Sequence, residues 1–159
     1  MTTIVVDSHV GFMAADRRST ANGTEAVMDN TGKIKQVELH DGIHLVGFSG
    51  NEGPAAIFLD WYEFGDEYEC PDPIDLDDEA DYGFEVVILT PDGTILVADR
   101  FMNPYEVENR FYCSGTGGAY AWGVLQAGCG IEKAMGAAIA LDVNSGGGYD
   151  IVYLSEINE

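Results

Sequence analysis

The chain has 159 residues, enough for one domain with a buried core, and a formal net charge of −21 at pH 7. An excess of negative charge repels phosphates, so the composition excludes a nucleic-acid-binding protein. No basic and apolar leader follows Met1, and no apolar stretch approaches the ~20 residues that cross a bilayer. We therefore expect neither export nor a membrane partner.

The charge is unevenly distributed. No Lys or Arg occurs between Lys35 and Arg100, and a dense acidic run extends from Asp60 to Glu85. Such a run keeps a surface solvated; alternatively, it steers basic partners or keeps an oligomer dispersed. The three cysteines are odd in number and lack metal-ligand spacing, which predicts free thiols in a reducing cytoplasm. The three histidines have no recurring spacing with carboxylates, so we expect no metal and no cofactor.

The first half of the chain predicts mainly strands. Residues 17–32 are polar and glycine-bearing, typical of a loop or an irregular hairpin, and Asp41-Gly42 is a strong hairpin turn. Pro54 suits the first turn of a helix. The predicted strands are 2–6, 11–15, 33–39 and 43–47, and the predicted helix is 55–64.

The second half predicts a hairpin, two helices and a final strand. Residues 65–82 are acidic and proline-bearing, which predicts an irregular surface loop. The hairpin strands are 84–89 and 94–98, the helices are 119–127 and 131–141, and the last strand is 151–154, with a short segment around 111–113. This order predicts an α+β layered fold in one domain, 1–159, with an acidic irregular insert at about 65–82.

Thr2 is the most informative residue. Removal of Met1 would give Thr2 a free α-amine beside its hydroxyl, and a terminal amine titrates near ~7.7. A base close to working pH suits proton abstraction from a hydroxyl, and a threonine with its own terminal amine is a recognised activated nucleophile. The alternative interpretation of Thr-Thr-Ile-Val-Val is an ordinary β-branched strand.

Further motifs follow Thr2 in a specific order: Ala14-Ala15-Asp16, Lys33-Ile34, Gly50, Gly115-Thr116-Gly117 and Asp142-x-x-Ser145-Gly146. Over nearly the whole chain this series resembles the proteasome β-subunit family of N-terminal-nucleophile (threonine) hydrolases. It is most similar to HslV, the peptidase subunit of a bacterial two-ring ATP-dependent protease, and to short phage or bacterial versions of it. The resemblance implies an αββα four-layer sandwich.

The resemblance also implies site roles. Thr2 would be the nucleophile, Asp16 and Lys33 its charged partners, and Gly50 a donor to the oxyanion hole. Lys35 is an alternative to Lys33, and Gly47 to Gly50. Asp142 and Ser145 would hydrogen-bond around the amine of the nucleophile, and Thr116 stands where the family usually has serine.

Elementary electrostatics is consistent with these roles. A lysine beside the terminal amine lowers the pKa of that amine, and Asp16 would hold the lysine in place. Backbone N–H groups at Gly50 would stabilise the tetrahedral oxyanion.

The implied function is a threonine endopeptidase of a self-compartmentalising ring that hydrolyses unfolded polypeptides after Met1 is removed. Its implied partners are polypeptide substrates, other copies of the chain in stacked rings, and an ATPase unfoldase. Two alternatives remain open at this point: a catalytically silent ring or scaffold subunit, and an N-terminal-nucleophile amidase acting on a small amide.

Overall fold

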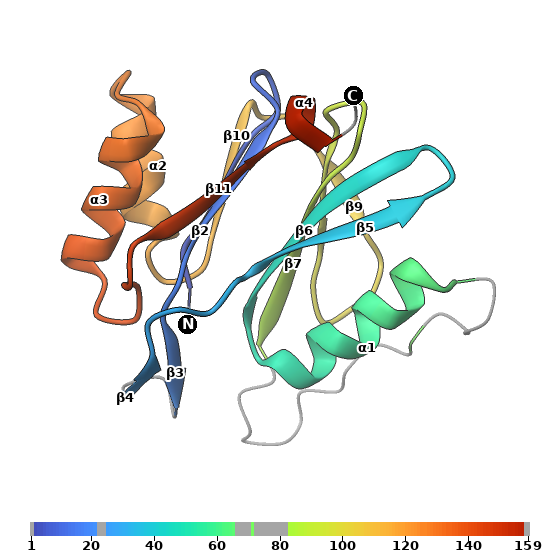
Figure 1. The fold of residues 1–159 in the computed structure, drawn as a ribbon, viewed down its shortest axis with the longest axis horizontal. Helices are drawn as coiled ribbons and strands as arrows, with labels where there is room; N and C mark the ends of the chain where they lie inside the picture. The colour runs from blue at the N-terminus through green and yellow to red at the C-terminus, as the bar shows by residue number, and fades with distance from the viewer. Residues whose placement is uncertain (1, 22–24, 66–70, 72–82, 158–159) are drawn as a thin grey trace.

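The structure is a computed structural model that describes residues 2–21, 25–65, 71 and 83–157. Within these ranges two antiparallel sheets lie face to face, with helices on both outer faces (Figure 1). The layers therefore run helix, sheet, sheet, helix. This arrangement confirms the predicted α+β four-layer fold.

The first sheet has four strands in the order β10-β1-β2-β11. Helices α2 (Gly118–Gln126) and α3 (Ile131–Leu141) cover its outer face through small residues such as Ala121, Ala134 and Ala138. Because this sheet is covered on both faces, its central strands read as continuous apolar runs instead of alternating ones. The strands are β1 (Ile4–Asp7), β2 (Phe12–Asp16), β10 (Phe111–Ser114) and β11 (Tyr149–Tyr153).

The second sheet has five strands in the order β5-β6-β7-β8-β9. Helix α1 (Glu52–Glu63) packs on its outer face through Phe58 and Leu59, and the Asn51 side chain caps the helix by accepting a hydrogen bond from the Gly53 N–H. The strands are β5 (Ile34–Leu39), β6 (Gly42–Gly50), β7 (Phe84–Leu89), β8 (Ile95–Ala98) and β9 (Tyr105–Val107).

The inner faces of the sheets meet in a dry core. Ile4, Val6 and Met13 of the first sheet pack against residues of the second such as Leu45 and Val87, all of them fully buried. Burying each such side chain contributes about 1.5–3 kcal/mol. β1 and β2 form the middle of the first sheet and run antiparallel, so this core holds Thr2, before β1, and Asp16, at the end of β2, at the same end of the sheet.

Several short elements differ from the sequence prediction. The polar segment after β2 forms a hairpin of β3 (Ser19–Ala21) and β4 (Glu25–Met28), one of the two forms expected. β9 was not predicted, nor was α4 (Leu154–Ile157); both are short and rely on neighbouring elements. Leu154 therefore begins a helix instead of ending the last strand, which starts earlier, at Tyr149.

The acidic segment lies almost wholly outside the described residues, so the prediction of an irregular loop at 65–82 is not tested. Cys113 and Cys129 are free, as expected, and Cys70 lies outside the described residues. In the described part of the chain, no helix has the length and apolar character to span a membrane.

Candidate active site

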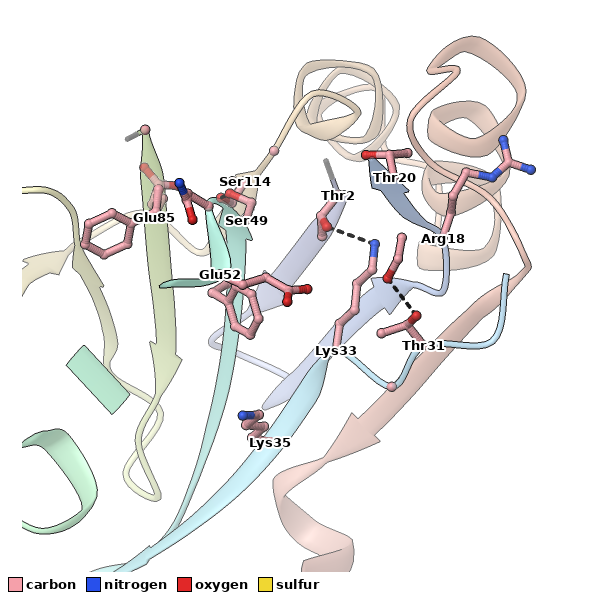
Figure 2. A pocket seen from close by; sticks show the side chains of 18 residues that line it. Thr2, Arg18, Thr20, Thr31, Lys33, Lys35, Ser49, Glu52, Glu85 and Ser114 are labelled. Atoms are coloured by element: carbon pink, nitrogen blue, oxygen red, sulfur yellow. Dashed lines mark hydrogen bonds between the residues drawn. The ribbon is translucent and has the colours of Figure 1, made fainter. Parts of the chain in front are cut away.

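Thr2 lies just before β1, with its hydroxyl in contact with a lysine. The Lys33 ammonium donates a hydrogen bond to Thr2 Oγ1 at 2.8 Å (Figure 2). It also forms an ion pair with Asp16 Oδ1, at 2.8 Å. Lys33 directly precedes β5, and Asp16 is the last residue of β2. Three separate segments thus bring a hydroxyl, an ammonium and a carboxylate into one row.

Asp16 is fully buried and is the electrostatic anchor of this row. Besides Lys33, its Oδ1 accepts a hydrogen bond from the Thr3 N–H, and its Oδ2 accepts from the N–H groups of Arg18 and Gly146. A buried carboxylate is tolerated only when it is paired and hydrogen-bonded, and here both oxygens are satisfied. The carboxylate therefore ties the start of β1 to the loop after α3.

Lys33 is buried, whereas Lys35, two residues later in the chain, is exposed. Burial lowers the pKa of Lys33, and the hydrogen bond and charge of Asp16 oppose that shift. Of the two lysines left open by the sequence, the structure places Lys33 against Thr2.

A second chain of hydrogen bonds runs behind Thr2. Thr3 Oγ1 is 2.7 Å from Ser145 Oγ, and Ser145 Oγ donates to Asp142 Oδ2 at 2.6 Å. Thr116 Oγ1 donates to the same carboxylate oxygen at 2.7 Å. The hydroxyl of Thr116 therefore binds the Asp142 carboxylate. Through Thr116 and Ser145, Asp142 connects the loop before α2 with the loop after α3.

Two glycines with positive φ lie beside Thr2 or its cleft. At Gly115, with φ +86°, a Cβ would lie 1.8 Å from the Thr2 carbonyl oxygen, so only glycine fits. Gly50, with φ +89°, ends β6 and lines the same cleft as Thr2. Gly47, the alternative to Gly50, faces Ile4 and Met13 in the core between the sheets. The structure thus brings Gly50, and not Gly47, to the cleft.

The cleft beside Thr2 has a volume of about 1110 Å³ and lies where the ends of the two sheets meet. Ser49 of β6 and Ser114 of β10 join the sheets there through buried hydroxyls 2.8 Å apart. Arg18, Phe48 and Glu52 also line the cleft.

Sequence reasoning missed several of these residues. Thr3 could have been found, because side chains alternate along an extended strand and two adjacent threonines must point to opposite sides. Ser49, Ser114 and Glu52 carry no such signal, since only the three-dimensional pairing of the sheets brings them to the cleft.

Neither a protein-family profile nor a curated protein sequence matches the chain. Solved structures do match in fold. HslV from Trypanosoma brucei aligns with a TM-score of 0.68 at 20% identity, over 95% of this chain and 98% of its own. BPH, a bacterial proteasome homologue from Thiobacillus denitrificans, aligns at 20% identity with TM-scores of 0.64 in complex with epoxomicin and 0.60 without that compound. The two alignments cover 96% of this chain and 99% and 97% of BPH.

Proposed function

We propose that this chain, whose fold is that of the proteasome-like threonine peptidase HslV, is itself a threonine endopeptidase with Thr2 as its nucleophile. The observation that carries the proposal is the contact of Lys33 Nζ with both Thr2 Oγ1 and Asp16 Oδ1. A fold alone does not imply an activity, but a buried ammonium held against a strand-end hydroxyl has a specific chemical use.

The chemistry begins after Met1 is removed. The free amine of Thr2 takes the proton from Oγ1, and Oγ1 attacks the carbonyl carbon of the scissile peptide bond. The positive charge of Lys33 lowers the pKa of that amine and stabilises negative charge developing on Oγ1. Backbone N–H groups at Gly50 stabilise the tetrahedral oxyanion.

The intermediate then breaks down in two steps. The protonated amine gives its proton to the leaving nitrogen, and the C–N bond breaks to leave an ester on Thr2. The amine next activates a water molecule, which cleaves the ester and frees the hydroxyl. Asp142, Ser145 and Thr116 position the strand that bears Thr2 through their contacts with Thr3 and one another.

We further propose that the chain assembles into stacked rings that enclose the active sites and receive unfolded polypeptides from an ATPase unfoldase. The likeness to HslV and to a proteasome homologue supports this assembly. A net charge of −21 would keep such a large particle dispersed.

The test is the intact mass of the purified protein before and after exposure to epoxomicin. An epoxyketone of this type forms a ring with the free amine and Oγ of one terminal residue, so it reports both at once. We expect loss of Met1, one adduct per chain, and no adduct in a Thr2→Ala variant. Retention of Met1 with no adduct would refute the peptidase and favour a silent ring subunit.

Native mass separates the two enzymatic alternatives. A peptidase with an enclosed chamber must assemble into a ring, whereas a monomer or dimer with a reactive Thr2 would indicate an amidase for small amides.

A further inference from the structure

Glu52 places a carboxylate in the cleft beside Thr2. It is the first residue of α1, and Figure 2 shows its side chain extending into the cleft from the side of the second sheet. A negative charge in the first turn of a helix interacts favourably with the positive end of the helix dipole. Burial lowers the pKa of Lys33 overall, and the charge of Glu52 is one of the smaller effects that oppose this shift, so its charge reaches the reacting groups.

The other charged groups of the cleft are mostly committed to partners within the chain. Lys33 is paired with Asp16, and Arg18 with Asp29. Glu85 interacts with the hydroxyl of Tyr112; burial raises the pKa of that hydroxyl, and the charge of Glu85 adds to the shift. Among the residues that the structure describes, Glu52 forms no ion pair and accepts no hydrogen bond.

Among the described residues, Lys35 and Glu85 are the other cleft charges without an ion pair, and Glu85 interacts with Tyr112. The side chains of Lys35 and Glu52 are both exposed, but Lys35 lies within β5, away from Thr2 in Figure 2. Glu52 instead begins a capped helix, so its backbone is fixed relative to Thr2. We therefore expect the carboxylate, and not Lys35, to meet the substrate residue next to the scissile bond.

Phe48 completes a binding surface for a long cationic side chain. Phe48 lines the same cleft and is half-buried, because it also packs against the apolar core beneath α1. Lysine and arginine side chains lie along apolar surfaces with their methylene groups and pair their charged ends with carboxylates, and arginine also stacks on aromatic rings. An aromatic ring together with an unpaired carboxylate offers such a side chain an apolar surface for its methylene groups and a hydrogen-bond acceptor for its charged end.

We propose that Glu52 selects substrates with a lysine or arginine next to the scissile bond, on its N-terminal side. The inference rests on the proposed function, since it concerns the substrate of Thr2. The charge of the whole chain acts in the same direction, because a net charge of −21 raises the local concentration of basic peptides.

The experiment uses three peptide epoxyketones that are identical except for arginine, leucine or glutamate beside the warhead. The rate of adduct formation on Thr2 is followed by intact mass. We expect arginine to react fastest and glutamate slowest, with a ratio of roughly 10- to 100-fold, as for a hydrogen bond to a charged group. Glu52→Gln should remove most of this ratio, and Glu52→Lys should reverse it.

Glu85→Gln is the matched control, because it removes the same charge from the same cleft at a carboxylate that already has a partner. It should keep most of the preference for arginine. An equal loss in both variants would attribute the preference to the net charge of the cleft and overturn the role of Glu52.

The wild-type protein alone distinguishes two kinds of failure. Equal rates with all three probes would overturn the inference and leave the peptidase proposal standing. No adduct with any probe would remove the peptidase proposal, and the substrate preference with it.

Discussion

Replacing Asp16 by asparagine tests whether this carboxylate holds the site together. The substitution keeps the shape of the side chain but removes the charge that faces Lys33 and one of the two acceptor oxygens. Those oxygens accept four hydrogen bonds, from Lys33 Nζ and from the N–H groups of Thr3, Arg18 and Gly146. Each oxygen accepts two of these bonds. The NH2 group of asparagine must therefore take the place of one oxygen and face two hydrogen-bond donors.

The magnitude follows from burial. Asp16 is fully buried and Lys33 nearly so, and removing one partner of a buried ion pair costs about 3–5 kcal/mol. In a chain of this length each kcal/mol lowers the Tm by about 2–4 °C, so we expect a decrease of roughly 6–20 °C. Urea unfolding followed by circular dichroism measures the free energy of unfolding directly.

Two further variants make the result interpretable. Asp29→Asn removes the carboxylate of an exposed ion pair with Arg18, and its effect should be much smaller. Adding Lys33→Met to Asp16→Asn removes the unpaired ammonium, so the double variant should recover part of the loss. A loss below about 1 kcal/mol for Asp16→Asn, or no recovery in the double variant, would refute the view of Asp16 as an electrostatic anchor.

Substitutions at Gly115, Thr116 and Asp7 test three other parts of the structure. Gly115→Ala should displace the Thr2 carbonyl and abolish reaction with epoxomicin, whereas Gly136→Ala, within α3 and with open space around it, should raise the unfolding free energy by about 0.5–1 kcal/mol. Thr116→Val should slow epoxomicin modification and Thr116→Ser should not, because only the hydroxyl contacts Asp142; equal rates would contradict this. Burial raises the pKa of Asp7, but hydrogen bonds from a neighbouring arginine and two backbone N–H groups outweigh it, so the pKa is lowered overall. The stabilisation is then present above the unfolded pKa of about 4 and lost as pH falls through the folded value, so Asp7→Asn should destabilise the chain near pH 7 and have less effect near pH 2, as measured by urea unfolding.

The sequence predicted the layers and most of the long elements because their signals are local. The alternation of residues 33–39 and the apolar runs of β1 and β2 identify strands without knowledge of their partners. β9 and α4 are too short for such a signal, since the pairing of Tyr105 with Val97 and the packing of Leu154 under the first sheet come from tertiary structure.

The same distinction between local and tertiary signals applies to the residues of the candidate site. The motif series located Thr2, Asp16 and Lys33, and the structure brings these three into contact, although their catalytic roles remain proposals. The choice between Lys33 and Lys35 could not be made from the pattern, because both fall on the same face of a strand. The structure distinguishes the two lysines, because Lys33 is buried against Thr2 and Lys35 is exposed. Glu52 was missed because its proximity to Thr2 depends on how two sheets meet.

The opposite orientations of Thr2 and Thr3 bear on the maturation that the proposed function requires. Thr2 directs its hydroxyl to Lys33, while Thr3 directs its own to Ser145 and gives its N–H to Asp16. A chain trimmed one residue too far would still begin with threonine, but its hydroxyl would face the structural side of the strand and its nitrogen would be bound to the carboxylate. Thr3 therefore cannot replace Thr2 as the proposed nucleophile. For Thr2 to act as proposed, Met1 must be removed by a cut at the Met1–Thr2 bond itself; a terminal threonine produced by a different cut would not be correctly placed.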